Sequence, residues 1–366
     1  MCLGRGDPTR VRAVNLIDVL GGEIGARPAG SEAAGRAANA VAAAFRELGL
    51  EPRLQEFSFL AYEPDQPELE VDGEPWAAGP AMYAQPAEVE GSARRIGTHV
   101  VLPGLFEPPA FAVEDGGREL ARIYGNPIGG GPTPFPTGYG PTLTGPAAYV
   151  SAADAARLRE GARVRLKVGG RFVPATERNV LAELPGESEE TVVVCAHYDS
   201  AWQAGGAVDN ASGVEGLRRI VERFAGHRRR RTLLAIAFGA EELGLSGSRF
   251  FVIDAKTRGE LGRIEAVVNL ECLAYGERLE LWASDDLKER GLRIAADLGL
   301  GALPTRPPIA GSDHFPFATE GIPAACILRW PYPEYHLPAD GPELADEALL
   351  ATATELAARL VEELLA

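Results

Sequence analysis

After residue 175, the hydrophobic residues fall into short apolar runs that alternate with longer amphipathic segments. Runs such as 191–196 and 232–238 are almost uniformly apolar and rich in β-branched residues, which is typical of strands buried on both faces. Segments such as 213–226 and 285–299 carry apolar residues at helical spacing. Strands that alternate with helices predict an α/β fold, in which helices cover both faces of a mainly parallel sheet.

The same pattern predicts further elements along the chain. Two helices are expected at 8–24 and 31–49, the second with Ser31 as its N-cap, and a strand at 50–60. The short segment 185–190 joins the strand at 179–184 to the strand at 191–196 and predicts a hairpin. The remaining expected helices are 246–253 and 345–366, and the remaining strands are 266–273, 279–283 and 324–330.

Proline and glycine crowd the chain between residues 61 and 170, most densely in NPIGGGPTPFPTGYGPTLTGP at 126–146. One helix at 152–160 and short strands at 98–102, 147–150 and 163–168 are expected there. Recurring Phe, Tyr and Trp residues argue against disorder. We therefore expect a loop-rich, mostly β subdomain at 61–170, inserted between residues 1–60 and 171–366 of one larger domain.

Charge and targeting signals narrow the class of protein. The net charge of −16 argues against nucleic acid and anionic membranes as partners. The N-terminal residues lack the apolar region of a signal peptide, and no window reaches the length of a membrane span, so we expect a cytoplasmic protein unless a leader was removed. Four cysteines are too few for a disulfide framework, and Cys195, Cys272 and Cys326 are expected to be reduced core residues.

Polar side chains gather where the apolar run 191–196 ends. His197 and Asp199 follow this run, and Asp209 lies ten residues further on, in a glycine-rich loop. Ligands of open α/β sheets bind beyond the carboxyl ends of the strands, so one imidazole and two carboxylates converge at that edge. This arrangement predicts half of a metal site.

Three further clusters have the same character. Glu241 and Glu242 follow the run 232–238, and neighbouring side chains on an extended backbone point in different directions, so one can bind a metal while the other addresses water. Glu271 ends a third apolar run. The other acids and histidines lie in GSDHFPF and PEYHLPAD, and they are Asp313, His314, His336 and Asp340.

Oxygen-rich ligation with one imidazole per metal suits two zinc ions that share a carboxylate, with water held between them. Such a pair polarises a carbonyl and supplies a nucleophilic hydroxide near neutral pH. A base must still take the proton of the water, and one of the paired glutamates is free for that role. Both His314 and His336 are candidates for the second imidazole.

The motifs HYDS, GAVDNASG, EELGLSGS, NLEC, SDHFPF and YHLPAD follow one another in an order that resembles family 28 of the metallopeptidases, in clan MH. Members of this family are di-zinc aminopeptidases, and relatives include bacterial leucyl aminopeptidases, glutamate carboxypeptidase II and glutaminyl cyclase. The resemblance covers residues 175–366 and the N-terminal helices with the strand after them. It implies a three-layer αβα zinc-exopeptidase fold with a mixed, mainly parallel sheet, and an insert similar to a protease-associated domain.

The resemblance also implies the metal ligands. His197 and Glu271 would bind one zinc ion, Glu242 and His336 the other, and Asp209 would bridge the two. The family pattern places the second imidazole in the later of the two histidine motifs.

Further roles follow from the same resemblance. Glu241 would be the general base, Asp199 would orient the imidazole of His197, and Asp313 would be a hydrogen-bonding neighbour of the site. A cis peptide bond is expected after Asp209. Glu271 stands where the family usually has aspartate. The loop after the strand could absorb its extra methylene by a shift of about 1 Å. The methylene could instead weaken the first metal site, change the preferred metal or narrow the space for the substrate amine.

The implied function is a zinc-dependent exopeptidase that removes N-terminal residues from peptides, with the free amine of the substrate against Glu241 and Glu271. The expected partners are peptides with a free N-terminus, and homo-oligomerisation stays open. One alternative is a single-zinc acyltransferase similar to glutaminyl cyclase, which the aromatic residues of PYPEYHLPAD favour. Another is a metal-free scaffold, although every ligand position holds a competent residue. Carboxypeptidase action on acidic peptides would need a basic pocket, for which Arg306 and Arg329 are the obvious donors.

Overall fold

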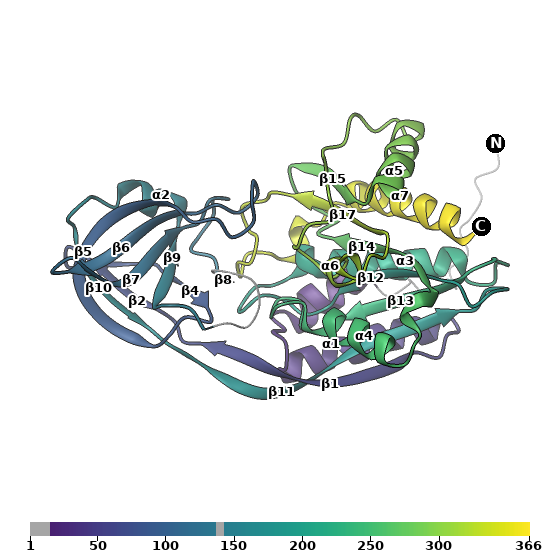
Figure 1. Ribbon diagram of the computed structural model, residues 1–366, viewed down its shortest axis with the longest axis horizontal. Helices are drawn as coiled ribbons and strands as arrows, with labels where there is room; N and C mark the ends of the chain where they lie inside the picture. Colours follow the sequence, from purple (N-terminus) through teal and green to yellow (C-terminus); the bar gives the residue numbers. More distant parts are fainter. Residues whose placement is uncertain (1–14, 137–142) are drawn as a thin grey trace, which may run out of the picture.

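The computed structural model describes residues 15–136 and 143–366, which form two lobes (Figure 1). The larger lobe contains an eight-stranded sheet with helices on both faces, and the smaller lobe contains a nine-stranded sheet. Two long strands, β1 (Arg53–Pro64) and β11 (Gly170–Leu184), pair antiparallel and run from one lobe to the other. We call this pair the stem.

The large sheet is mixed and mainly parallel, as the sequence predicted. Its strand order is β1-β11-β13-β12-β14-β17-β15-β16. Parallel pairs join β12 to β13 and β14, β14 to β17, and β15 to β16, whereas β1–β11, β11–β13 and β15–β17 are antiparallel. The strand bounds are β12 (Thr191–His197), β13 (Thr232–Phe238), β14 (Ile264–Glu271), β15 (Arg278–Ala283), β16 (Thr305–Arg306) and β17 (Ala324–Trp330).

The expected hairpin across 185–190 is wrong. The strand β13 lies between β11 and β12, so the two strands that flank this segment do not pair with each other. The uniformly apolar β12 instead occupies the centre of the sheet, where two parallel neighbours bury both of its edges.

Helices cover both faces of the large sheet. Val192 and Val194 of β12 pack with helices α1, α3, α5 and α7, and Val193 and Cys195 pack with α4 and α6 on the other face. Ser31 caps α1 as expected by accepting a hydrogen bond from the Ala34 amide. The helix bounds are α1 (Glu32–Glu47), α3 (Gly213–Phe224), α4 (Ser246–Thr257), α5 (Asp285–Asp297), α6 (Phe315–Thr319) and α7 (Glu347–Leu365).

Short helical turns complete the larger lobe: η1 (Asp18–Ile24), η2 (Ala207–Ser212), η3 (Leu261–Arg263) and η4 (Pro342–Leu344). The expected helix at 8–24 lies partly outside the described residues, and η1 occupies its second half. No helix in the described ranges is both long and apolar enough to cross a membrane.

The smaller lobe is more regular than its composition suggested. Its sheet has the order β3-β2-β10-β5-β6-β7-β9-β4-β8, and α2 (Ala152–Arg157) packs on it. Its strands lie between β1 and β11 in the sequence. Their bounds are β2 (Glu68–Val71), β3 (Glu74–Trp76), β4 (Gly79–Met82), β5 (Ala87–Thr98), β6 (Pro109–Asp115), β7 (Arg118–Gly125), β8 (Phe135–Pro136), β9 (Ala147–Val150) and β10 (Arg163–Val168).

The strand expected at 98–102 is wrong, because β5 ends at Thr98 and the chain then turns. Leu102 makes only an isolated bridge with Phe106, across a turn that contains Pro103 and Gly104. The strands β5, β6 and β7 were not predicted. In β5 polar residues alternate with small ones, which gives a weak apolar signal, whereas the apolar residues of β6 and β7 form only short runs.

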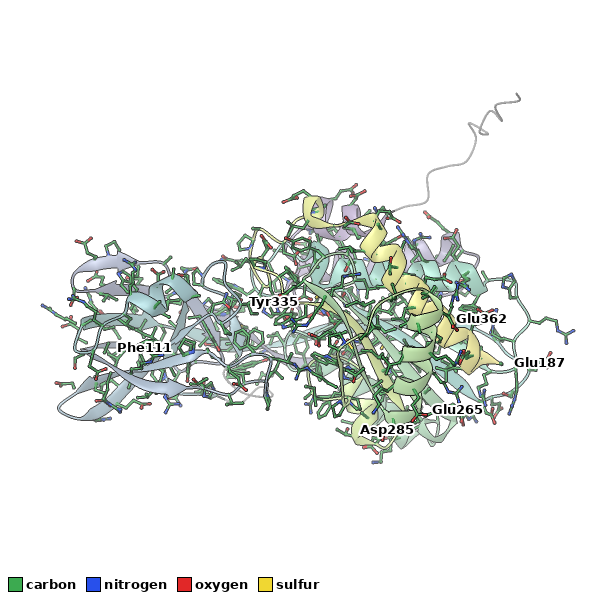
Figure 2. The ribbon with its side chains drawn as sticks, turned by 90° about the horizontal axis from the view of Figure 1, so that it is seen from above. Phe111, Glu187, Glu265, Asp285, Tyr335 and Glu362 are labelled. Atoms are coloured by element: carbon green, nitrogen blue, oxygen red, sulfur yellow. The ribbon has the colours of Figure 1, made fainter. Side chains whose placement is uncertain are left out.

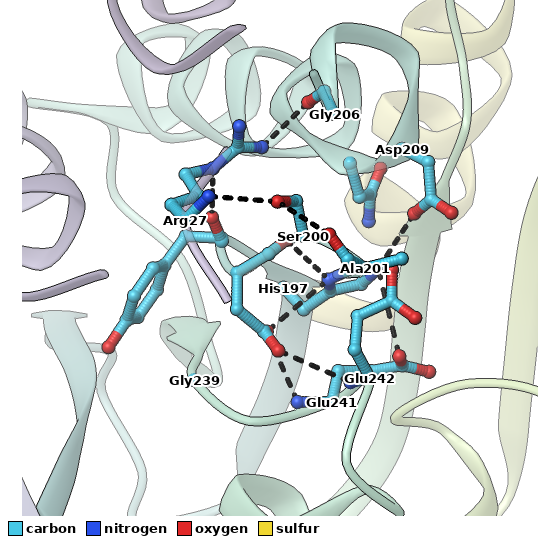
Figure 3. Close-up of polar contacts among 12 residues, drawn as sticks. Arg27, His197, Ser200, Ala201, Gly206, Asp209, Gly239, Glu241 and Glu242 are labelled. Carbon is cyan, nitrogen blue, oxygen red and sulfur yellow. Dashed lines mark hydrogen bonds and ion pairs between the residues drawn. The ribbon is translucent and has the colours of Figure 1, made fainter. Parts of the chain in front are cut away.

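Arg27 fastens the N-terminal segment to the loops that follow β12 (Figure 3). The side chain is fully buried and donates hydrogen bonds to five backbone carbonyls, with no carboxylate among these acceptors. Two of the acceptors are the carbonyl oxygens of Gly205 and Gly206, the residues directly before η2. They lie 3.0 and 2.6 Å from the Nη1 and Nη2 atoms of Arg27. Burial lowers the pKa of Arg27 to about 10, against the opposing effect of nearby carboxylates such as Asp340.

Replacing this guanidinium is expected to destabilise the larger lobe. Arg27→Met should lower the free energy of unfolding by roughly 3 kcal/mol or more, because several buried carbonyls lose their donor at once. Thermal or urea unfolding measures the change. Arg36→Met, on the exposed face of α1, is the matched control and should change stability by about 0.5 kcal/mol or less. Equal stability of the two variants would contradict this role for Arg27.

Candidate metal centre

The predicted site residues meet at the carboxyl edge of the large sheet (Figure 3). His197 is the last residue of β12, Glu271 is the last residue of β14, and Glu241 and Glu242 lie in the loop after β13. Because these strands are parallel neighbours, their ends deliver all four side chains to one place. The loop containing η2 adds Asp209, and the loop after β17 adds His336.

The carboxylate of Asp209 stands between the two imidazoles. Its Oδ1 lies 3.2 Å from His197 Nε2, and its Oδ2 lies 3.3 Å from His336 Nε2. A second carboxylate accompanies each imidazole. Glu271 Oε1 lies 3.1 Å from His197 Nε2, and Glu242 Oε2 lies 3.2 Å from His336 Nε2. The site therefore consists of two three-residue sets that share Asp209.

These separations fit zinc. Two ligand atoms bound at about 2.0–2.1 Å to one tetrahedral zinc ion lie about 3.3 Å apart. His336 Nε2 and Glu242 Oε1 are buried and make no hydrogen bond within the described structure, as expected of atoms that bind a metal ion. The residues present thus suit a pair of zinc ions. Cys272, expected to be a plain core residue, is buried with its sulfur 3.6 Å from Glu271 Oε1.

Asp199 supports both His197 and the loop that carries Glu241 and Glu242. Its carboxylate accepts hydrogen bonds from the backbone amides of Glu241 and Glu242, at 3.1 and 3.2 Å. Its backbone carbonyl lies 3.2 Å from His197 Nδ1, and its Oδ1 lies 3.5 Å from the same nitrogen. The residue therefore orients the imidazole mainly through its carbonyl, and its side chain holds the loop that carries the paired glutamates.

Asp340 holds the backbone at Asp209 in the same way, through backbone amides. Its two carboxylate oxygens accept hydrogen bonds from the amides of Val208 and Asp209, at 2.8 and 3.0 Å, and Tyr332 donates to it at 3.2 Å. The peptide bond between Asp209 and Asn210 is cis, as the resemblance implied. Sequence reasoning named Asp340 only as a neighbour of His336. The two backbone amides that it holds, those of Val208 and Asp209, lie more than 130 residues away along the chain.

The longer side chain of Glu271 fits the site. Its Oε2 accepts a hydrogen bond from Ser312 at 2.5 Å, and Ser312 in turn accepts one from Asn269 at 2.7 Å. Sequence reasoning singled out Asp313 in this motif and missed Ser312 beside it. Asp313 is buried, and burial raises its pKa to about 7.

The smaller lobe holds the second imidazole in place. His336 Nδ1 donates to the backbone carbonyl of Pro134 at 2.9 Å, which leaves Nε2 free to face the carboxylates. The ring stacks on Tyr335, with centroids 3.9 Å apart, and on Phe135, at 5.2 Å. Tyr335 lies where the two lobes meet (Figure 2). No sequence signal pointed to Pro134 or Phe135, because their connection to His336 is purely tertiary.

His314 does not join the carboxylates. It is fully buried, its ring packs edge-on against Trp282, and burial lowers its pKa to about 4. Of the two histidines that the sequence left open, the structure brings His336 and not His314 into the cluster.

Burial governs the charges of the site. It raises the pKa of Glu242 to about 8 and that of Asp340 to about 7, with the charge of Asp209 adding to both shifts. Burial by itself would lower the pKa of His336, but Glu242 and Asp209 outweigh it and raise the value to about 9. When several of these buried carboxylates are ionised, they repel one another. Bound divalent metal ions would offset this repulsion.

Two cavities flank the cluster and share no lining residue. The smaller, of about 40 Å³, is lined by Glu241, Glu271 and Asp209, by His197 and Arg329, and otherwise by mainly apolar residues. The apolar residues include Leu102, Leu105, Phe135, Trp282, Leu328 and Trp330. The larger, of about 600 Å³, begins at Glu242 and His336 and extends along the stem.

The metal-free protein is expected to lose stability as pH rises from about 5 to 9. The carboxyl of Glu242 has its pKa raised from 4.5 to about 8, so the folded state binds its proton more tightly, and that advantage disappears between these values. The raised pKa of His336 works in the same direction, through pH 9. Zinc binding requires the deprotonated ligands and therefore strengthens with pH. The gap in melting temperature between zinc-loaded and chelator-treated protein should widen from pH 5.5 to pH 8.5 in thermal scans. A constant gap would contradict this account.

Comparison with known proteins agrees with this geometry. Residues 179–361, half of the chain, match the model of Peptidase family M28. Aminopeptidase YwaD of Bacillus subtilis (strain 168) is 27% identical over 399 residues, which cover 96% of this chain and 84% of the relative.

Solved structures agree in fold over both lobes. BSAP, a zinc aminopeptidase from Bacillus subtilis, superposes with a TM-score of 0.73 at 24% identity and covers 95% of this chain and 93% of its own. The aminopeptidase from Aneurinibacillus sp. strain AM-1 gives a TM-score of 0.71 at 22% identity, covering 95% and 92%. Together with the order of the motifs and the paired ligand sets, the match places the chain in Peptidase family M28.

Proposed function

We propose that the protein is a zinc-dependent aminopeptidase that binds two zinc ions. The observation that carries this proposal is the pair of ligand sets that share Asp209, with the uncommitted carboxylate of Glu241 beside them. His197 and Glu271 complete the set for one ion, and Glu242 and His336 complete the set for the other. The family and the aminopeptidases among its relatives support the same activity.

Zinc bound there would polarise the scissile carbonyl and acidify a water molecule. The protein's own contribution is the proton transfer. Glu241 Oε2 lies 4.0 Å from His197 Nε2, close to the ligands but outside both sets. Burial raises its pKa, which suits a carboxylate that takes a proton from the attacking water and then passes it to the leaving amine.

The smaller cavity explains why the enzyme would act at the N-terminus. It is small, and the carboxylates of Glu241, Glu271 and Asp209 line it together with Arg329 and several apolar residues. A protonated amine gains charge-assisted hydrogen bonds in such a place, whereas a continuing peptide chain has no room. The N-terminal residue would therefore occupy this cavity, with its amine against the acids.

The alternative activities find less support. Arg306 lines neither of the two cavities beside the cluster, whereas Arg329 lines the smaller one together with the carboxylates of Asp209, Glu241 and Glu271. Three carboxylates accompany this single cation, so the cavity suits a protonated amine better than the carboxylate of an acidic residue. A single-zinc cyclase or a metal-free scaffold would not need two complete ligand sets.

Removing the proposed base should abolish turnover and leave the metals in place. Glu241→Gln keeps the shape of the side chain and is expected to lower kcat for peptide hydrolysis by a factor of about 10² to 10⁴, since it removes general base catalysis. Metal content per chain, measured by mass spectrometry on the same sample, should stay at the wild-type value. A fall in metal content in proportion to activity would instead make Glu241 a ligand.

The two-ion arrangement predicts distinct losses of zinc. Glu242→Ala and Glu271→Ala should each retain about one ion per chain, and Asp209→Ala fewer than either, because Asp209 belongs to both sets. Glu265→Ala, at an exposed position near the beginning of β14, is the control and should retain the wild-type content. Wild-type protein purified with a single ion would contradict the proposal.

A further inference from the structure

We propose that the larger cavity binds the leaving part of the peptide as an added strand along the free edge of β11, so that the enzyme prefers peptides of four or more residues to dipeptides. This inference rests on the proposed aminopeptidase function. It assigns a substrate length and a binding mode to the side of the metal centre that faces the stem.

The larger cavity is continuous with the metal centre. Glu242 and His336 line it, as do residues 61–63 of β1 and 173–176 of β11 in the stem. Trp202 and the N-terminal segment 28–31 form further walls, and the amide of Gly30 in that segment donates to Glu177 of β11 at 2.8 Å. A peptide whose first residue fills the smaller cavity must leave the metal centre on the opposite side, and that side opens into this space of about 600 Å³.

The edge of β11 in this cavity has no strand beside it. β11 pairs with β1 from Gly170 onwards, but its pairing with β13 begins only at Val180. Figure 1 shows β11 continuing past β13 towards the smaller lobe. Among the described residues, the stretch 170–178 therefore pairs with a strand on one side only, and residues 173–176 of this stretch line the cavity.

An open strand edge binds extended peptides through main-chain hydrogen bonds. Four residues of strand span about 13 Å, which matches three or four residues of an extended substrate. Such bonds do not depend on side chains, so they would serve peptides of varied sequence. Trp202, half-buried in the loop after β12, adds an aromatic surface on a further wall.

The lining of the cavity also favours longer substrates. No lysine or arginine is among the described residues that line it, and its acidic residues are Glu63 and Glu242. A dipeptide would bury its carboxylate in this cavity without a cationic side chain beside it, which is unfavourable. A longer peptide places its C-terminal carboxylate further from the metal centre.

A length series tests the proposal directly. Peptides with the same first residue and one to six alanines after it are compared by kcat/KM on the zinc-loaded enzyme. The value should rise by about 10- to 100-fold between one and four leaving residues and then stay level, as expected for two or three additional hydrogen bonds. Equal values for all lengths would overturn the inference while leaving the aminopeptidase function intact. No hydrolysis of any peptide would overturn both.

An N-methyl scan of the pentapeptide tests the strand geometry without altering the protein. Each methyl group removes one main-chain donor at the second, third or fourth leaving residue. Only alternate residues of a strand bond to a given neighbour, so kcat/KM should fall at every second position and change little between. Losses without this alternation would show that the cavity holds the peptide in another way.

A pair of tryptophan variants tests the aromatic wall. Trp202→Ala should reduce the ratio of pentapeptide to dipeptide kcat/KM by about fivefold or more. Trp76→Ala, on β3 of the smaller lobe, where Arg157 lies 4.0 Å from its ring, is the matched control and should leave this ratio unchanged. An unchanged ratio in Trp202→Ala would remove this residue from the binding surface, and together with a flat length series it would overturn the proposal.

Discussion

The shared carboxylate of Asp209 is the interaction on which the rest of the site depends. It lies between the imidazole of His197, at the end of β12, and that of His336, in the loop after β17. Each imidazole has a second carboxylate beside it. These acids are almost fully removed from water, where uncompensated negative charge is costly. The fold therefore concentrates negative charge around Asp209, where bound cations are stabilising. The arrangement of nitrogen and oxygen atoms there suits two zinc ions.

Holding such a repulsive cluster together requires support from several parts of the chain. Asp199 fixes the loop of the paired glutamates, and Asp340 fixes the backbone at Asp209. Arg27 ties the loop before Asp209 to the N-terminal segment through carbonyl groups. Each support acts on the backbone next to a ligand. The ligand side chains themselves are therefore left to face one another around Asp209.

The smaller lobe takes part in the site and does more than cover it. Pro134 accepts the hydrogen bond that fixes the orientation of His336, and Phe135 stacks on the same ring. The stem that carries this lobe also forms one wall of the larger cavity. One insertion thus contributes to the second metal set and to the path of the leaving peptide, so a change in the position of the lobe would affect both.

The apolar runs and the polar residues at their ends determined the α/β class, most elements of the larger lobe and the ligand candidates, because burial and strand direction are local properties of the pattern. Glu271, Glu242 and His197 were foreseen for this reason. The position of β13 between β11 and β12 and the contacts of Ser312, Asp340, Arg27 and Pro134 were decided only by the tertiary structure. These depend on contacts between residues more than 40 positions apart, for which short-range periodicity carries no information.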